Sequence, residues 1–274
     1  MIFYSHIFRG VLKTVGGVAA AIARGKAGTA TRWRDRSQDN RAMRFCFSLA
    51  LALTASFFMT TTATNAAPAT DLGERLAACT ACHGTEGRTI NAEYLPRIAG
   101  KPSGYLYHQL LNFRDGRRHN AAMTHLLQPL SDAYLRDMAA YFSALDLPYP
   151  APAVPKASAD VLGRGEALVL RGDAARQLPA CAQCHGTPLT GVAPAVPGLL
   201  GLPAAYLRAQ LGAWRAGQRR AQAPDCMGEM AQALTPADID AVAAWLAAQP
   251  VPPHNRPLAA PSAPLPLRCG GVSP

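Results

Sequence analysis

The sequence predicts an all-α protein built from two tandem copies of one small helical domain. Apolar side chains recur at three- and four-residue steps in several segments, which is the period of a helix. No stretch shows the two-residue alternation that is typical of a strand. The chain also matches itself when it is shifted by 101 to 104 residues, and a repeat at a fixed spacing indicates a duplicated structural unit.

The repeat covers most of each copy and suggests the domain boundaries. The block Gln109-Leu110-x-x-Phe113-Arg114-x-Gly116-x-Arg118 aligns with Gln210-Leu211-x-x-Trp214-Arg215-x-Gly217-x-Arg219. We expect a leader at 1–66, a first domain at 67–147, a Pro-rich linker at 148–158, a second domain at 159–251 and a Pro-rich tail at 252–274. The linker should be extended and stiff, whereas the tail either wraps the surface or lacks a fixed structure.

Three helices are expected in the first copy. One starts near Asp71, a second runs over about 103–115, and a third begins after Leu130 with Ser131 as its N-cap. The second copy should repeat this order, with a first helix from near Asp160. Its last helix should have Thr235 as the N-cap and Pro236 at the first helical position.

The first helix of each copy is expected to end in a Cys-x-x-Cys-His motif, at 79–83 and again at 181–185. This pattern attaches a c-type haem, because two thiols bond to the porphyrin and the adjacent imidazole binds the iron. A zinc ribbon would need two closely spaced Cys pairs, and a thioredoxin-like pair would lie in a βαβ pattern, so neither fits. We therefore expect two covalently bound haem c groups, attached through Cys79 and Cys82 and through Cys181 and Cys184, with His83 and His185 as axial ligands.

The second axial ligand of each iron should come from the same copy. Met123 and Met227 each lie seven residues before the leucine that introduces the last helix, Leu130 or Leu234. A loop methionine at this point can return over the haem face opposite the histidine. Its soft thioether favours reduced iron and raises the reduction potential.

Other side chains remain candidates for this position. In the first copy, His108, His119 or His125 could give a bis-histidine iron, although none of the three recurs in the second copy. In the second copy, Met230 competes with Met227, and Cys226 could place a thiolate on the iron. The repeat favours Met227 over Met230, because the first copy has no methionine at the latter position.

The N-terminal segment has the pattern of an export signal. Residues 1–66 hold nine of the 27 basic and two of the 17 acidic residues, so the rest of the chain is only mildly cationic and nucleic acid is not an expected partner. Arg41 and Arg44 precede the apolar run Phe45–Met59, and small residues follow up to an expected cleavage site near Ala66. We expect a periplasmic protein, with membrane attachment only if the leader stays uncleaved. Residues 1–42 are either an upstream extension before a start at Met43 or a genuine extension.

Three patterns together resemble the di-haem cytochromes c4 and the related cytochromes c553. They are the duplicated Cys-x-x-Cys-His-Gly motif, the Tyr-Leu-x-x-Gln-Leu-x-x-Phe/Trp-Arg-x-Gly block, and the Met that precedes a Leu-Ser/Thr pair. The resemblance covers roughly 71–248 and implies two class I cytochrome c domains related by a pseudo-two-fold axis. It also implies His83/Met123 and His185/Met227 ligation. It further implies that the Pro96 and Pro197 carbonyls accept from the axial histidines, and that Arg114 and Arg215 lie near the haem propionates or the domain interface.

Two features depart from the family pattern. The tail is long, and Cys226 and Cys269 lie outside the haem motifs. In an oxidising compartment these two cysteines are expected to form a disulfide that fixes the tail near the second methionine loop. Free thiols, or Cys226 as an iron ligand, are the alternatives.

The expected function is single-electron transfer rather than catalysis. The carrier would take electrons from a quinol-oxidising complex or a dehydrogenase and pass them to a terminal oxidase. One alternative is a cytochrome subunit of a periplasmic dehydrogenase complex. Another is a di-haem oxidoreductase of the thiosulfate-oxidising type, which would need a Cys-ligated or bis-histidine iron.

Overall fold

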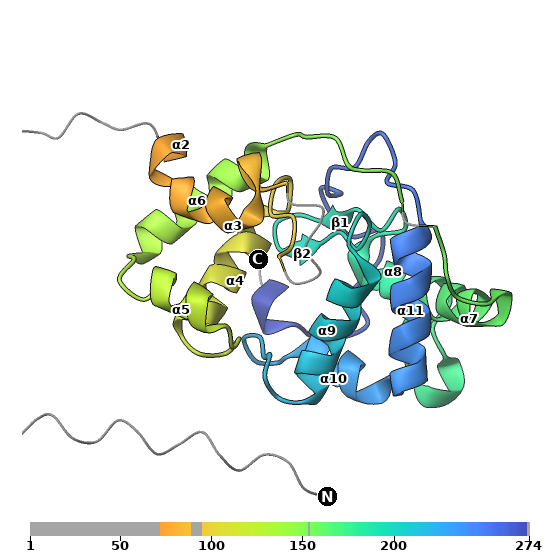
Figure 1. Ribbon diagram of the computed structural model, residues 1–274. Coiled ribbons are helices and arrows are strands. Elements are labelled where there is room, and N and C mark those ends of the chain that lie inside the picture. The colour runs from red at the N-terminus through yellow and green to blue at the C-terminus, as the bar shows by residue number, and fades with distance from the viewer. Residues whose placement is uncertain (1–71, 89–94, 153, 273–274) are drawn as a thin grey trace, which may run out of the picture. The chain divides into compact units, whose positions relative to one another are not determined.

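The computed structural model describes residues 72–88, 95–152 and 154–272 of the chain (Figure 1). The expected leader lies outside these residues. Among the described residues, none of the helices is both long and apolar enough to span a bilayer. These described residues belong to one compact unit that contains both copies of the repeat.

The fold is all-α, as predicted, and the two copies follow one another along the chain (Figure 1). The first copy contains α2 (Leu72–Arg75), α3 (Ala77–His83), the 3-10 turn η1 (Thr85–Gly87), α4 (Ser103–Arg114), α5 (Ala121–Leu127) and α6 (Asp132–Ala144). The second contains α7 (Ala159–Leu170), η2 (Ala174–Arg176), α8 (Cys181–His185), β1 (Gly191–Val192), β2 (Val196–Pro197), α9 (Ala204–Arg215), α10 (Cys226–Ala233) and α11 (Pro236–Ala248). The tail ends in η3 (Gly270–Val272).

The helices that follow the haem motifs begin where local capping predicts. Ser131 accepts a hydrogen bond from Tyr134 N at the start of α6. Thr235 and Asp238 cap each other's backbone N–H groups at the start of α11, and Pro236 occupies its first position. These contacts involve residues three apart in sequence, which is why the sequence alone locates both helices.

The segment before the second motif differs from the expected single helix. α7 stops at Leu170, and ten residues separate it from α8. Gly172 turns the chain with a φ of 70°, and a Cβ there would lie 2.3 Å from the Leu178 carbonyl oxygen. The interruption therefore comes from a close backbone approach that helical periodicity does not register. The pair of two-residue strands, β1 and β2, was also not predicted, because such short strands show no alternation.

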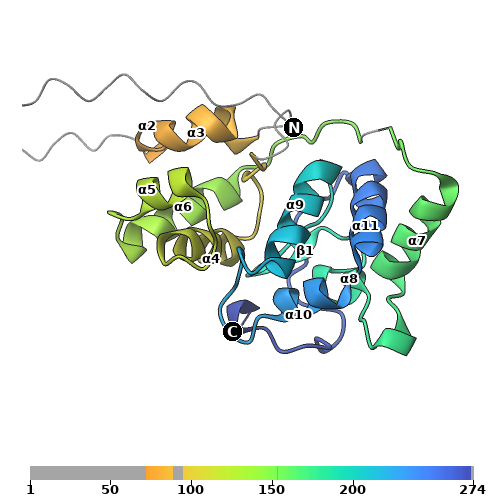
Figure 2. The same cartoon turned by 60° about the horizontal axis from the view of Figure 1, so that its bottom comes forward.

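Each copy buries its own apolar cluster. In the first, α4 packs on α6 and α5, around residues such as Leu76, Leu135 and Phe142. In the second, α11 packs on both α7 and α9, and the three helices lie side by side in Figure 2. Gly165 allows α7 to approach α11 closely, because a Cβ at this position would lie 2.2 Å from the Ala241 carbonyl oxygen. Domains of this size have small cores, so a bound group that completes them would add much of their apolar contact.

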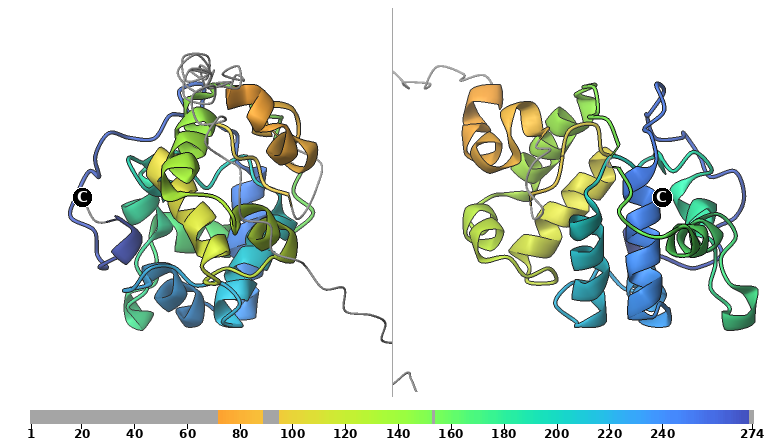
Figure 3. Two further views of the ribbon diagram at one scale, coloured as in Figure 1. Left: turned by 90° about the vertical axis from the view of Figure 1, so that its left-hand side faces the viewer. Right: turned by 45° about the vertical axis from the view of Figure 1, so that its right-hand side comes forward.

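The linker is held against the first copy. Arg97, which is 4% exposed, donates to the carbonyl oxygens of Leu147 and Pro148 at 2.6 and 3.0 Å. Its guanidinium also stacks on the Tyr149 ring at 4.0 Å. The tail then leaves α11 and runs along the second copy to η3 (Figure 3, left, blue).

Candidate haem-binding site

The first motif lies on the last turn of α3. Cys79, Cys82 and His83 fall on one helical face, since residues three and four apart are neighbours on a helix surface. The His83 ring is 8% exposed, and its Nδ1 lies 2.9 Å from the Pro96 carbonyl oxygen. Burial lowers the pKa of His83, so the ring is neutral at neutral pH. A neutral ring that donates from Nδ1 to this carbonyl leaves the Nε2 lone pair available to a metal.

The second motif repeats this geometry on α8. His185 is 7% exposed, and its Nδ1 lies 2.7 Å from the Pro197 carbonyl oxygen. Burial lowers the pKa of His185, with Lys101 as a further cause. Burial also raises the pKa of the Cys181 thiol to about 11, so this thiol is protonated at neutral pH. The side chain of Gln183 caps the start of α8 by accepting from Ala180 N at 2.9 Å.

A methionine stands near the start of a short helix in each copy, and not in the loop that was expected. Met123 is the third residue of α5, and its N–H donates to Asn120 Oδ1 at 3.0 Å. Met227 is the second residue of α10, whose N-cap Asp225 accepts from Gly228 N at 2.9 Å. The repeat therefore places a methionine in the first turn of a capped helix twice, one position apart and with a different capping residue in each copy.

All the predicted haem contacts line one cavity of about 860 Å³. They are Cys79, Cys82, His83, Met123, Cys181, Cys184, His185 and Met227. Of the alternative ligands, His108, His119 and Met230 also line it, whereas His125 is not among its described lining residues. Cys226 is joined to Cys269 in a disulfide with a sequence separation of 43, so it has no thiol to offer the iron. Cofactor sites typically occupy roughly 300–1,000 Å³ with apolar walls and a few polar groups, which this cavity satisfies.

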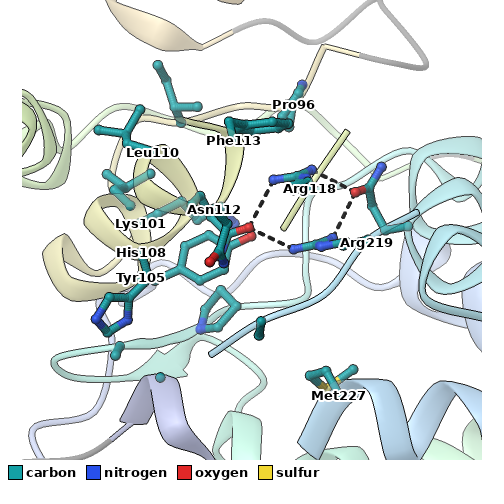
Figure 4. Close-up of a pocket in the computed structure, with 18 of the residues that line it drawn as sticks. Pro96, Lys101, Tyr105, His108, Leu110, Asn112, Phe113, Arg118, Arg219 and Met227 are labelled. Atoms are coloured by element: carbon teal, nitrogen blue, oxygen red, sulfur yellow. Dashed lines mark hydrogen bonds between the residues drawn. The ribbon is translucent and has the colours of Figure 1, made fainter. Parts of the chain in front are cut away.

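Two buried arginines in this cavity, Arg118 and Arg219, were not singled out from the sequence (Figure 4). They are 9% and 5% exposed. Arg118 donates to Gln109 Oε1 at 3.0 Å and to Gln210 Oε1 at 2.6 Å, while Arg219 donates to the same two oxygens at 3.0 and 2.8 Å. Within the described residues, neither forms an ion pair with a carboxylate.

Two cations buried side by side make this part of the cavity attractive to an anion. Burial and the charge of Arg118 lower the pKa of Arg219 to about 10. The Lys101 ammonium is also buried, at 6% exposure, and lines the same cavity. Haem carries two propionates, and arginine matches a carboxylate with two parallel donors. The residues present therefore fit two haem groups, and Arg118 and Arg219 would bind their propionates.

The structure gives Arg114 and Arg215 other partners. Arg114 donates to Asp132 at 2.6 Å, to Asp115 at 3.0 Å and to the Leu130 carbonyl at 3.2 Å. Arg215 donates to the carbonyl oxygens at the end of α10. Neither is among the described residues that line the cavity. The repeated block that carries Arg114 and Arg215 also contains Arg118 and Arg219, so the repeat could have identified all four arginines. Only the tertiary contacts show which two of them line the cavity.

Comparison with known proteins shows the family of the chain. The Cytochrome c family model matches residues 70–146 and 169–249. A thiosulfate dehydrogenase electron acceptor of Thiomonas intermedia is 44% identical over 65% of this chain and 81% of that protein. A protein of the same name from Stutzerimonas stutzeri is 39% identical over 62% and 78% of the two chains. Cytochrome c4 of Pseudomonas aeruginosa is 36% identical over 63% and 84%.

Solved structures give the same fold. Reduced recombinant cytochrome c4 from Pseudomonas stutzeri is 31% identical, with a TM-score of 0.56 over 64% of this chain and 95% of that one. The as-isolated thiosulfate dehydrogenase (TsdBA) of Marichromatium purpuratum is 34% identical, with a TM-score of 0.57 over 63% of this chain. This chain spans only 36% of that larger protein.

Proposed function

The chain belongs to the cytochrome c family, and from that premise we propose that it is a di-haem electron carrier that accepts electrons from a thiosulfate-oxidising dehydrogenase. Membership of this family implies covalently bound haem c in both domains of the chain. The partner is suggested by similarity: the two proteins named as acceptors of thiosulfate dehydrogenase are 44% and 39% identical, above the 36% of a cytochrome c4.

The lining of the cavity supports an assignment of the haem contacts. We infer that Cys79 and Cys82 attach one haem, and that Cys181 and Cys184 attach the other. His83 and Met123 would bind the first iron, His185 and Met227 the second, with the Pro96 and Pro197 carbonyls fixing the histidine rings. When bound, each haem supplies one-electron redox chemistry, and His/Met ligation sets a high potential. With both axial positions of each iron occupied by these side chains, no open site would remain for a substrate, which favours a carrier over an enzyme.

The leader pattern and the disulfide support an exported location. We infer that the protein is exported, because haem attachment of this type and the Cys226–Cys269 disulfide both fit an oxidising compartment. From there it would deliver its electrons to a terminal oxidase. A second candidate function is to accept electrons from a quinol-oxidising complex, and similarity to the cytochromes c4 supports it.

The ligand assignment is tested by single substitutions. Met123→Leu and Met227→Leu should each remove about half of the near-infrared methionine-to-iron charge-transfer band of the ferric protein, because each removes one of two thioether ligands. Met138→Leu and Met230→Leu are the controls and should leave the band intact. Loss of band in Met230→Leu with retention in Met227→Leu would reverse the assignment in the second copy.

The partner is tested by stopped-flow mixing. The oxidised protein is mixed with thiosulfate and the thiosulfate dehydrogenase of Thiomonas intermedia, and haem reduction is followed by its visible absorbance. We expect reduction about tenfold or more faster than that of cytochrome c4 from Pseudomonas aeruginosa under the same conditions, a difference of ~1.4 kcal/mol in activation free energy. Thiosulfate alone should reduce neither. Two results together would favour the quinol-oxidising complex as the electron donor: equal reduction rates for the two cytochromes, and faster reduction of this protein by that complex than by the dehydrogenase.

A further inference from the structure

The described part of the tail, residues 252–272, contacts the second copy on both sides of its haem motif and methionine. We call this segment the strap. Leu258 pairs with the loop after α8: its N–H donates to Gly191 O at 2.9 Å, and its carbonyl accepts from Ala193 N at 2.7 Å. The Leu258 side chain also lies against Gly186, the residue that follows His185. One end of the strap is thus fixed beside the histidine side of the haem site.

The other end of the strap is fixed beside Met227. The disulfide joins Cys269 to Cys226, the residue immediately before Met227. Gly270 N donates to Pro224 O at 2.9 Å, and a Cβ at Gly270 would lie 2.1 Å from the Ala223 carbonyl oxygen. The approach is therefore close enough to need glycine. Between the two ends, Leu265 and Leu267 line the same cavity as Met227.

Nothing comparable holds Met123 within the described residues. The start of α5 is fixed by the Asn120 cap and by Thr124 Oγ1, which donates to Phe113 O at 3.1 Å. Position 122 before Met123 is an alanine, and the sequence has no cysteine near it. The chain thus contains an internal reference: of the two methionines on equivalent helices, only Met227 directly follows a crosslinked cysteine. Figure 4 shows Met227 on its helix in the cavity that Arg118 and Arg219 also line.

We propose that the strap, through the Cys226–Cys269 disulfide, is a positioning element that holds Met227 at the second iron. The proposal rests on the proposed ligation of that iron by Met227. A crosslink one residue away from a ligand limits how far its helix start can move, so it favours the bound arrangement of the thioether over the dissociated one. The first iron, without a crosslink, keeps its methionine by capping and packing alone.

The test measures how readily carbon monoxide replaces the methionine on ferrous iron. In the full-length protein with both haems, Cys226→Ser/Cys269→Ser should raise the carbon monoxide affinity of one haem per molecule by about tenfold, within the usual range of coupling between sites. The other haem should be unchanged. Asn120→Ala is the matched control in the first copy: it loosens α5 and should affect only the first haem.

A double-mutant cycle separates the strap from the ligand. Met227→Leu should itself expose the second iron to carbon monoxide, and adding the two serines in that background should then change nothing. If Met227→Leu leaves carbon monoxide binding as in the wild type, the ligand assignment fails. If Met227→Leu exposes the iron but the two serines alone have no effect, the ligand stands and the strap proposal is overturned. An equal effect of the serines with and without Met227 also overturns it.

A second route covers a variant that does not accumulate with both haems. The folded wild-type protein is treated with dithiothreitol, which is oxidised to its cyclic disulfide while the Cys226–Cys269 bond becomes two thiols, and thiol labelling counts them. The ferrous protein should then show the same tenfold rise at one haem. Two labelled thiols with unchanged carbon monoxide affinity would overturn the proposal.

Discussion

Four arginines, two in each copy, show how a residue's role depends on contacts that its sequence position does not reveal. Arg114 and Arg118 lie four apart, as do Arg215 and Arg219. The first of each pair binds groups of its own copy, and the second is buried in the shared cavity. A half-buried cation and a buried cation therefore come from the same repeated block.

Arg215 should contribute to stability without affecting the redox potential. Arg215→Gln removes the donor to three carbonyl oxygens at the end of α10, which we expect to cost about 1–2 kcal/mol. Urea unfolding of the haem-loaded protein measures the loss, and a redox titration should give unchanged midpoint potentials. Arg208→Gln on the same helix is the control, because Arg208 forms only an exposed pair with Asp240 at 3.7 Å and should cost almost nothing. A shift of the second haem's potential in Arg215→Gln would restore the role near the propionates.

At the level of elements, α11 depends on one fully buried carboxylate. Asp238 is 0% exposed and caps the helix by accepting from Thr235 N at 2.9 Å. It also accepts from Arg164 Nε at 2.7 Å and from Arg176 Nη1 at 2.8 Å. α11 packs on both α7 and α9, so this carboxylate links the start of the central helix to the segment before the second haem motif.

Asp238→Asn should destabilise the protein in a pH-dependent manner. Despite the opposing effect of burial, hydrogen bonds from Thr235 and the two arginines hold the pKa of Asp238 well below its usual range. A depressed folded-state pKa adds stability that is complete above the unfolded-state pKa of about 3.9 and is lost as the pH falls toward the folded value. We expect a loss of about 2–3 kcal/mol at pH 7, since both arginines keep partial solvent contact. The loss should shrink by about 1 kcal/mol at pH 3.

Urea unfolding of the haem-loaded wild type and variant at the two pH values measures this difference. Asp240→Asn is the control, because its carboxylate is exposed and pairs only weakly with Arg208. A destabilisation of the same size at both pH values would mean that shape, not charge, makes Asp238 important.

The elements that the sequence predicts best are those fixed by neighbours along the chain. Ser131, Thr235 and Pro236 act within one helical turn, so α6 and α11 begin where expected. The break between α7 and α8 depends on the approach of Gly172 to Leu178, and it was missed. The same holds for the site: the motif cysteines and histidines are local patterns, whereas the cluster of Arg118 and Arg219 exists only once the two copies meet.

At the scale of the whole molecule, the two copies contact each other reciprocally. Arg118 and Arg219 pair in an antiparallel bridge. His119 N donates to Gln218 O at 3.1 Å, and the equivalent Arg220 N donates to Arg117 O at 2.6 Å. Gln109 and Gln210 each accept from both arginines. In a two-fold interface, equivalent residues make equivalent contacts. Here the duplication produces such an interface within one chain.

Arg118 and Arg219 lie in the cavity that both copies line, so removing one of these charges should affect the potentials of both haems. Arg219→Gln deletes a buried positive charge beside the cavity that holds both sets of haem contacts. Ferric iron carries one more positive charge than ferrous iron, so losing a nearby cation favours the oxidised form and lowers the midpoint potential. At an effective dielectric constant of about 20 we expect a decrease of roughly tens of millivolts. Arg220→Gln is the matched control, because it removes the same charge from the next, exposed residue, where water screens it. Spectroelectrochemical titration measures the midpoint potentials of the two haems separately. A decrease at only one haem, or a decrease no larger than in Arg220→Gln, would show that the interface does not couple the two haems electrostatically.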